Sequence, residues 1–405
     1  MIVFLTKFYK MRILNQQNFK NQRAIVRVDF NVPLNEKFEV TDRTRIEAAK
    51  PTIDYILNKG GSCVLLSHLG RPDGRDPKLS LSHIVKTVAE VLDRPVKFCS
   101  TSVGTEAEAA SNGLDQGEVL LMENLRFHKE ETSGDVIFSE KLARLGTIYV
   151  NDAFGTAHRA HASTTIIARF FGKNKCFGSL LEKEVLAIEK VMDQGEKPIL
   201  AILGGAKVSS KITIIESLLE TVDHLIIGGG MVYTFTKALG GKVGNSICEP
   251  EYCDYALELL EKAKEKGVQI HLPVDVLAGN DFSNNANQQT FDVMNIPEGW
   301  EAMDSGPESQ TIFHELIITC KTILWNGPMG VFEFSNFSKG TIAVGNSIAK
   351  ATYEGAFSLV GGGDSVAAVK QFGFENKMSY ISTGGGAMLE SLEGKTLPGI
   401  AALNE

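Results

Sequence analysis

Short apolar runs rich in β-branched residues alternate along the chain with segments of helical periodicity. Each run has the length of a buried strand, and intervening segments such as residues 81–92 repeat apolar positions with the period of a helix. The predicted strands are residues 24–28, 62–66, 119–122 and 147–150 in the first half, and residues 199–203, 224–227, 268–272, 322–325, 357–360 and 378–381 in the second. Such alternation is typical of α/β proteins with mainly parallel sheets.

The two halves are predicted to form separate sheets. A length of 405 residues favours two or three domains over one. Residues 180–192 have helical period and few breakers, and the Gly- and Pro-containing residues 194–198 follow them, which predicts a connecting helix between domains. Residues 280–287 and 297–308 are polar and rich in turn-forming residues, and we expect them to be loops.

Composition and charge exclude several classes of function. The chain is 43% hydrophobic and 22% charged, as globular proteins are, and no apolar run reaches the ~18 residues of a membrane helix. The formal net charge of −8 provides no overall positive field to hold a nucleic acid. We therefore expect a soluble protein in which local basic clusters bind any anionic ligand.

Cysteine usage and the N-terminus indicate a cytoplasmic protein. The six cysteines are scattered without a CxxC pair, which fits reduced core thiols better than disulfides or a zinc site. The apolar stretch 2–5 is too short for the core of a signal peptide. A second methionine, Met11, leads into the first predicted strand, so residues 1–10 are interpreted as an upstream start or a frayed tail.

Glycines follow five predicted strands of the second half. Any one of these loops could be an ordinary tight turn, but five together indicate backbone N–H groups that approach phosphates at helix starts. The sequence contains no GxxxxGK[ST], and each GxG lacks the third glycine of GxGxxG, which disfavours Walker ATPases and ordinary dehydrogenases. The loops are Gly204-Gly205, Gly228-Gly229-Gly230, Asn326-Gly327-Pro328, Gly361-Gly362-Gly363 and Gly384-Gly385-Gly386.

Three polar residues near these glycines suit a nucleotide. Lys207 and Lys211 are spaced i,i+4 and would share a face if a helix starts there, although two solvated lysines are an equally good interpretation. Asp364 opens a predicted helix beside Ser365 and could hold Mg²⁺ near the phosphates, serve as a helix cap, or do both.

Charged side chains, in contrast, follow the strands of the first half. Basic groups at one sheet edge of an acidic protein indicate a small, multiply anionic ligand, although each arginine taken alone is better explained as a surface ion pair. Asp29 and Asn31 would face the same side of an extended chain, as partners of a hydroxyl or as part of an Asx turn. The basic residues are Arg45, His68, Arg71, Arg126 and Arg159.

The HxxH spacing of His158 and His161 is a weak metal signal. No Cys or carboxylate with ligand spacing follows, and Arg159 between the two histidines would repel a cation. No GxSxG or cysteine nucleophile context is present either, which disfavours hydrolase and acyl-enzyme chemistry and leaves transfer between two anions.

Long ordered motifs through nearly the whole chain resemble the phosphoglycerate kinase family. The second half contributes Gly204-Gly205-Ala206-Lys207-Val208, Trp325-Asn326-Gly327-Pro328-Met329-Gly330-Val331-Phe332-Glu333 and Gly361-Gly362-Gly363-Asp364-Ser365. The first half contributes Arg27-Val28-Asp29-Phe30-Asn31-Val32-Pro33, Ser67-His68-Leu69-Gly70-Arg71-Pro72, Glu123-Asn124-Leu125-Arg126-Phe127 and Asp152-Ala153-Phe154-Gly155-Thr156-Ala157-His158-Arg159-Ala160-His161.

The resemblance implies two Rossmann-like doubly wound parallel-sheet α/β domains joined by a hinge helix. The expected boundaries are residues 1–179 for a 3-phosphoglycerate-binding domain, 180–194 for the helix, 195–383 for a nucleotide-binding domain, and 384–405 for a segment that returns to the first domain. It also implies reversible phosphoryl transfer between 1,3-bisphosphoglycerate and Mg-ADP, with in-line geometry and domain closure, in a cytoplasmic and monomeric enzyme of glycolysis.

By the same resemblance, site residues can be assigned. The residues expected to bind the glycerate ligand are Asp29, Asn31, Arg45, His68, Arg71, Arg126 and Arg159. Those expected to bind the nucleotide are Gly205, Lys211, Gly229, Gly230, Gly306, Asn326, Pro328, Glu333, Gly361, Gly362, Gly363, Asp364 and Ser365, with Asp364 on Mg²⁺. Arg45, Lys207 and Lys211 are expected to stabilise the transferring group, since a carboxylate nucleophile is already ionised at neutral pH and needs no general base.

The sequence departs from the family pattern in a few places, among them a basic N-terminal extension that shorter members lack, and two rival functions remain open. Residues 276–285 lack the Ala-Asp-Lys-Phe run of many relatives, and Ser365 stands where Thr is frequent. A dehydrogenase with an unusual cofactor loop would bind NADH, and a hinged ligand-binding protein would lack the grouping of Lys207, Lys211 and Asp364.

Overall fold

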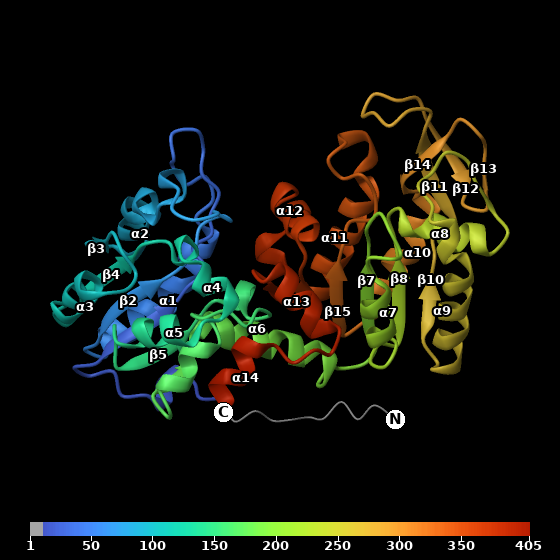
Figure 1. Ribbon diagram of the computed structural model, residues 1–405. Coiled ribbons are helices and arrows are strands. Elements are labelled where there is room, and N and C mark those ends of the chain that lie inside the picture. Colours follow the sequence, from blue (N-terminus) through green and yellow to red (C-terminus); the bar gives the residue numbers. More distant parts are fainter. Residues whose placement is uncertain (1–10) are drawn as a thin grey trace. The chain divides into compact units, whose positions relative to one another are not determined.

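In the computed structural model, which describes residues 11–405, the chain forms two compact units (Figure 1). The first unit extends to Leu186 and also contains Lys395–Glu405, and the second is Ala187–Gly394. Residues 1–10, interpreted above as an upstream start or tail, lie outside the described residues.

The first unit is built on a six-stranded parallel sheet with the order β3-β4-β2-β1-β5-β6. Its central strands are largely apolar, as expected for a parallel sheet covered by helices on both faces. The bounds are β1 Arg23–Arg27, β2 Ser62–Leu66, β3 Val96–Cys99, β4 Val119–Met122, β5 Ile148–Asn151 and β6 Lys175–Phe177. In register, Arg27 lies between Leu66 of β2 and Asn151 of β5.

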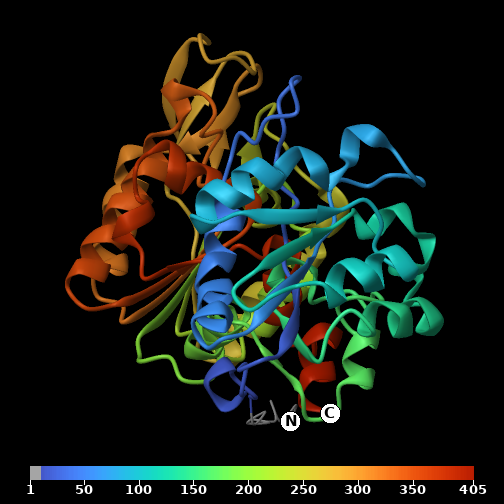
Figure 2. The ribbon, with the colours of Figure 1, turned by 90° about the vertical axis from the view of Figure 1, so that its left-hand side faces the viewer.

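Helices α1 and α2 lie side by side on one face of this sheet (Figure 2). Ile53 of α1 and Val88 of α2 belong to the same buried cluster as Val26 and Leu65 of the strands. The helices of the unit are α1 Thr44–Asn58, α2 Val85–Leu92, α3 Thr105–Asn112, α4 Lys129–Ser133, α5 Val136–Ala143 and α14 Pro398–Asn404.

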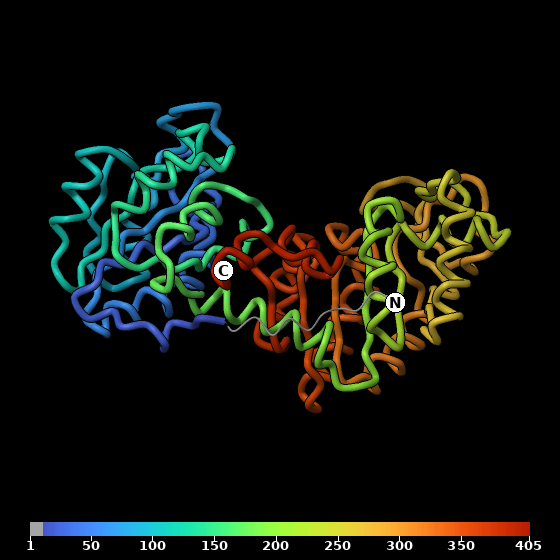
Figure 3. The backbone as a smooth tube through the Cα atoms, turned by 60° about the horizontal axis from the view of Figure 1, so that its bottom comes forward, coloured from blue at the N-terminus to red at the C-terminus, as the bar shows by residue number. Residues whose placement is uncertain are grey.

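Helix α6 (Ser179–Met192) begins in the first unit and ends in the second (Figure 3). Its N-terminus is held by Asp152, whose Oδ1 accepts hydrogen bonds from the backbone N–H groups of Leu180 and Leu181 at 2.9 and 3.2 Å. After the second unit the chain re-enters the first at Lys395, and α14 packs against β6 and residues 166–170.

The second unit has its own six-stranded parallel sheet, in the order β10-β8-β7-β15-β16-β17. The strands are β7 Ile199–Leu203, β8 His224–Ile227, β10 Gln269–His271, β15 Thr322–Asn326, β16 Phe357–Val360 and β17 Tyr380–Ile381. The helices are α7 Ile212–Leu218, α8 Met231–Ala238, α9 Cys253–Glu265, α10 Pro307–Ile317, α11 Lys339–Tyr353, α12 Gly363–Gln371 and α13 Gly385–Leu392. Two parallel sheets flanked by helices confirm the predicted α/β class.

The expectation that residues 297–308 are only a loop is wrong. Residues 297–308, expected to be a loop, contain strand β14 (Glu301–Ser305), which pairs with β11 (Asp275–Gly279) and through it with β12 (Gln288–Asp292) in an antiparallel sheet. Residues 280–287 form the loop between β11 and β12. A separate two-stranded pairing joins β9 (Lys242–Val243) to β13 (Asn295–Ile296).

The cysteines are all unpaired, but only four of them are core thiols. Cys63, Cys99, Cys176 and Cys320 are buried, whereas Cys248 and Cys253 are half-buried.

The strand order of each sheet reverses beside its first strand, and such a reversal marks where ligands bind in these folds. In the first unit the reversal lies between β1 and β5, and in the second between β7 and β15. The loops that leave the carboxyl ends of these strands carry the charged residues of the first unit and the glycines of the second.

Candidate functional site

Asp29, Asn31 and Arg45 are joined by hydrogen bonds at the end of β1. Arg45, in the first turn of α1, donates from Nη1 to Asp29 Oδ2 at 2.9 Å and to the Asn31 backbone carbonyl at 3.2 Å. Asn31 Oδ1 accepts from the backbone N–H of Gly70 at 2.8 Å, which ties this group to the loop after β2. Asp29 Oδ1 is buried without a hydrogen-bond partner among the described residues.

His68 lies beside this group and is itself buried. Its Nδ1 is 3.7 Å from Asp29 Oδ1 and 3.3 Å from Nη2 of Arg27. Burial, and then the positive charges of Arg27, Arg126 and Arg45, lower the pKa of His68 well below its usual range. Both effects favour the neutral form of the His68 imidazole.

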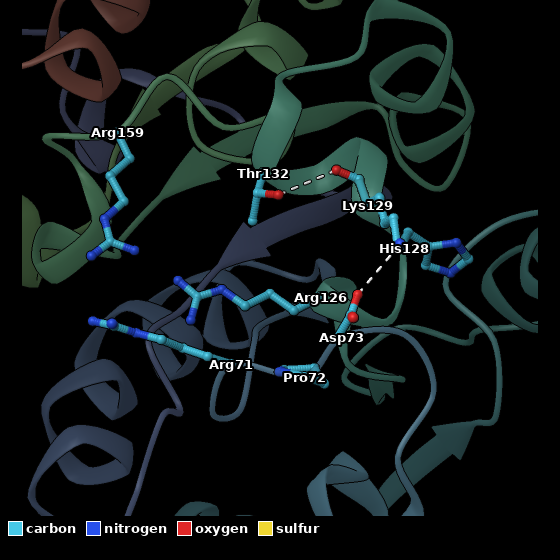
Figure 4. Close-up of a pocket in the computed structure, with 8 residues that line it drawn as sticks. All are labelled: Arg71, Pro72, Asp73, Arg126, His128, Lys129, Thr132 and Arg159. Carbon is cyan, nitrogen blue, oxygen red and sulfur yellow. Dashed lines mark hydrogen bonds and ion pairs between the residues drawn. The ribbon is translucent and has the colours of Figure 1, made fainter.

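Three arginines face one cavity of about 480 Å³ in the first unit. The guanidinium groups of Arg71, Arg126 and Arg159 converge there from three different loops (Figure 4). Arg126 donates from Nη1 to the Gly70 carbonyl at 2.6 Å, and burial together with Arg159 lowers the pKa of its guanidinium to about 10. Arginines this close repel one another unless an anion lies between them, so the cavity suits a phosphate.

Sequence reasoning missed part of this cavity. His128, Lys129 and Thr132 complete its wall, and Lys129 forms an exposed ion pair with Asp73 at 3.4 Å (Figure 4). Lys129 and Thr132 belong to α4, directly after the Arg126 loop, and nothing in their spacing distinguishes them from a solvated helix face.

Asn124 holds two of the arginine loops in place. Its Oδ1 accepts from the backbone N–H groups of Leu69 and Arg126, and its Nδ2 donates to the carbonyls of Leu69 and Leu79. All four hydrogen-bonding positions of this buried amide are thus used, which fixes the loop that carries Arg71 against the one that carries Arg126.

The second unit has a cavity of about 260 Å³ built largely from backbone. Gly205, Gly229, Gly230, Pro328, Glu333 and Asp364 line it as expected. A side chain on Gly229 would collide with the backbone of Gly205 at 2.7 Å, and Gly229 also has φ +67°, so glycine is required there. The remaining wall is largely apolar, and its Tyr233, Ile247, Phe282, Val331 and Phe332 were not singled out from the sequence.

Lys211 and Asn326 meet beside this cavity. The Lys211 ammonium donates to Asn326 Oδ1, and Asn326 Nδ2 donates to the Gly361 carbonyl at 2.7 Å. Burial lowers the pKa of Lys211, while Asp364 and Glu393 oppose that shift. Ser365 Oγ accepts from the Gly327 N–H at 2.5 Å, which joins the start of α12 to the loop after β15.

Eight residues predicted for nucleotide binding or catalysis do not line this cavity: Lys207, Lys211, Gly306, Asn326, Gly361, Gly362, Gly363 and Ser365. Helix α7 begins only at Ile212, so Lys207 lies exposed in the preceding loop, and the expected helical face shared with Lys211 is wrong. Gly306 does not line the cavity: it precedes α10 and donates its N–H to the Asp275 carbonyl at 2.9 Å. A Cβ there would collide with the Asp275 carboxylate, which explains the glycine structurally.

Within residues 11–405, no group of three or more His, Cys, Asp or Glu side chains is arranged to hold a metal ion. Asp364, at the start of α12, is one of three carboxylate residues that line the glycine-lined cavity, with Glu301 and Glu333. The same part of the chain contains no helix long and apolar enough to cross a membrane.

A guanidinium-lined cavity on one α/β unit and a glycine-lined cavity on another define a phosphotransferase for small anionic substrates. The family model described as phosphoglycerate kinase matches residues 14–395. The chain belongs to the phosphoglycerate kinase family.

Individual relatives agree with this assignment. A phosphoglycerate kinase of Porphyromonas gingivalis is 51% identical, in an alignment that covers 96% of this chain and 99% of that protein. A cytosolic phosphoglycerate kinase of Nicotiana tabacum is 49% identical, covering 97% of this chain and 98% of that protein. The solved phosphoglycerate kinase structure from Coxiella burnetii is 38% identical with a TM-score of 0.89, covering 97% of this chain and 98% of that chain.

Proposed function

We propose that the chain catalyses reversible transfer of a phosphoryl group between 1,3-bisphosphoglycerate and Mg-ADP, giving 3-phosphoglycerate and Mg-ATP. The observation that carries this proposal is the division of labour between the units: three converging guanidinium groups around one cavity, and close-packed glycines beside Lys211 and Asp364 around the other. This is the step of glycolysis in which the family acts, and the cytosolic relatives support a cytoplasmic location.

The first unit is proposed to hold the glycerate. Arg71, Arg126 and Arg159 surround a space suited to the phosphate that is not transferred. His68 does not line this cavity, but it lies within the electrostatic influence of Arg126. Asp29 and Asn31 would bind the hydroxyl and carboxyl end, since Asp29 Oδ1 lacks a hydrogen-bond partner among the described residues.

The second unit is proposed to hold the nucleotide. The adenosine would lie against Gly205, Gly229 and Gly230, with its phosphates towards the start of α12 at Gly363. Asn326, Pro328, Gly361 and Gly362 would shape this path, and Glu333 lines the adenosine end.

Mg²⁺ fits this arrangement as an ion carried largely by the nucleotide phosphates. Hard oxygen ligands from one or two carboxylates are usual for Mg²⁺ in such sites, and Asp364 supplies one beside Ser365. When bound, the ion neutralises charge on the phosphates.

Catalysis is proposed to depend on alignment and charge rather than on a base. The carboxylate of 3-phosphoglycerate is ionised at neutral pH, so the protein needs only to place it in line and to neutralise the moving group. Arg45, Lys207 and Lys211 are proposed for that role, together with the N-termini of α12 and α13. Bending around residues 180–194 and 382–394 would bring the reactants together and exclude water, in a monomer.

A coupled assay tests the proposal directly. The purified chain, given 1,3-bisphosphoglycerate, Mg²⁺ and ADP, should form ATP, and omission of any one component should abolish it. Failure to form ATP by a folded chain would refute the function. Small-angle scattering with both substrates tests the closure separately, because the proposal requires compaction that neither substrate alone produces fully.

A further inference from the structure

Arg27, the last residue of β1, is only 1% exposed, and none of the roles above involves it. Its Nε donates to Ser163 Oγ at 2.7 Å, its Nη1 donates to the Val28 carbonyl, and its Nη2 lies 3.3 Å from His68 Nδ1. Arginine is almost never fully buried unless its donors are satisfied, so each of these contacts limits where the guanidinium can lie.

The orientation of this guanidinium is fixed by a chain of hydrogen bonds through Ser163 to Glu131. Ser163 donates from Oγ to Glu131 Oε1 at 2.6 Å and from its backbone N–H to Glu131 Oε2 at 3.0 Å. Because the hydroxyl proton is used on Glu131, Ser163 Oγ can only accept from Arg27. Glu131 is completely buried and its carboxylate partly balances the charge of Arg27.

The contact with His68 determines where the imidazole carries its proton. A guanidinium N–H can donate but never accept, so Nδ1 of His68 must accept, and the proton of the neutral ring lies on Nε2. An imidazolium, or the other tautomer, would set an N–H of the ring against an N–H of Arg27. Asp29 Oδ1, at 3.7 Å from the same nitrogen, is too far away to accept a hydrogen bond.

The surroundings of His68 agree with a neutral ring. The charged and titratable groups that face it are Arg27, Arg126, Arg45, His161 and Asp29, and four of these five are basic. Of them, His161 also has a pKa lowered to about 4, by burial and then by Arg27, Arg126 and Arg159, so it adds no positive charge near neutral pH.

We propose that Arg27 is a positioning residue that fixes His68 as the neutral Nε2–H tautomer, so that His68 offers the glycerate ligand a hydrogen-bond donor instead of a positive charge. The identity of the ligand rests on the proposed function, whereas the tautomer does not. The consequence is that the positive charge of the site comes from its arginines and Lys129, and not from His68.

Long-range ¹H–¹⁵N spectra of the full chain with labelled histidine test the tautomer without any ligand. His68→Gln identifies the His68 signals by their loss. His68 should show an acceptor-type Nδ1 and a protonated Nε2 at pH 7.5. A protonated Nδ1, alone or with Nε2, would overturn the proposal, even if the enzyme were fully active.

Arg27→Lys tests the cause. Lysine keeps the charge but has no second donor arm for His68, so the His68 signals should shift towards a mixture of tautomers. The KM for 3-phosphoglycerate should rise roughly tenfold while the KM for ATP stays unchanged. His83, whose Nε2 lies 2.8 Å from the Pro77 carbonyl, is the internal reference and should not change. Unchanged His68 signals in a folded variant would overturn the role of Arg27.

Ser163→Ala is the second test of the role of Arg27, and it replaces Arg27→Lys if that variant does not fold. This variant keeps Arg27 but removes the group that orients it, so the same shift of the His68 signals is expected in smaller measure, and its absence would contradict the proposal. A wild-type chain with the expected spectrum but no ATP formation would refute the proposed function alone.

Discussion

Gly204 and Gly327 lie against each other where the strand order of the second sheet reverses. A Cβ built on Gly204 would lie 2.6 Å from the carbonyl carbon of Gly327, and one built on Gly327 would lie 2.6 Å from Gly204 Cα. Both clashes are with backbone, which cannot rotate away. The loops after β7 and β15 can therefore approach closely only because neither residue has a side chain.

Gly204→Ala is expected to destabilise the second unit by about 3 kcal/mol or more and to weaken nucleotide binding, because the two loops must move apart. The measurement is denaturant unfolding together with ADP titration. Gly113→Ala is the control: its Cβ would lie 3.4 Å from the Ala109 carbonyl oxygen, an ordinary contact, at φ −84°. It should change stability by no more than ~0.5 kcal/mol. Equal effects of the two changes would contradict the packing argument.

Arg45→Ala should lower kcat by roughly 100- to 1000-fold while changing the KM for 3-phosphoglycerate far less, since the proposed role is to neutralise charge during transfer. Arg43→Ala is a matched control two residues away, because Arg43 is paired with Glu90 on an exposed surface. Steady-state kinetics of both variants decide the matter. A near-normal kcat for Arg45→Ala would remove Arg45 from the catalytic set.

Lys211→Ala and Lys207→Ala should differ in kind. Lys211 is hydrogen-bonded to Asn326, so its loss leaves a buried amide oxygen unsatisfied and should weaken both ATP binding and stability, the latter by about 1–3 kcal/mol. Lys207 is exposed, so its loss should lower kcat and leave stability unchanged. Kinetics and thermal unfolding test both. Loss of stability in Lys207→Ala, or its absence in Lys211→Ala, would show that the contacts are misassigned.

Deprotonation of the buried Asp304 carboxyl should lower the free energy of unfolding as pH rises. Burial raises the pKa of its carboxyl from 3.8 to about 7, although the N–H groups of Gly340 and Ser305 oppose the shift. The unfolded chain therefore releases this proton first, and the stabilisation present below about pH 4 is lost as the pH passes 7. Each unit of pKa difference corresponds to ~1.4 kcal/mol as an upper bound.

The free energy of unfolding of wild type and Asp304→Asn, measured from pH 5 to pH 8, isolates this contribution. The difference should move in favour of the variant as pH rises, because asparagine has no proton to lose. A difference that is independent of pH would contradict the raised pKa.

Much of the fold could be predicted because buried parallel strands leave continuous apolar runs. The strands at 62–66, 119–122, 199–203, 224–227 and 357–360 were predicted to the residue, since polar or glycine loops flank each of them. Edge strand β3 was missed because Lys97 interrupts it and most of its residues are only half-buried or exposed. Strand β12, Gln288–Asp292, is polar and mostly exposed, so its pattern cannot be distinguished from a loop.

Site residues that directly follow a strand could be predicted from the sequence. Site residues that reach the cavity only through tertiary packing could not. Arg126, Arg71 and Arg159 converge because their loops follow β4, β2 and β5 of one sheet. In that sheet β4 lies next to β2, and only β1 separates β2 from β5. Phe282 lines the glycine-lined cavity from the loop between β11 and β12. Because that loop is otherwise polar, the sequence gives no sign that Phe282 belongs to the site. The role of Gly306 against Asp275 likewise depends on a contact across 31 residues that spacing alone does not reveal.

The central claim is that each unit binds one substrate. Hydrogen exchange of backbone amides, followed with 3-phosphoglycerate alone and with Mg-ADP alone, tests it most directly. The first ligand should protect the loops around Gly70, Arg126 and Arg159 and leave the second unit unchanged, and the nucleotide should protect only the loops around Gly205, Gly229 and Gly362. Protection of the same unit by both ligands would contradict the account.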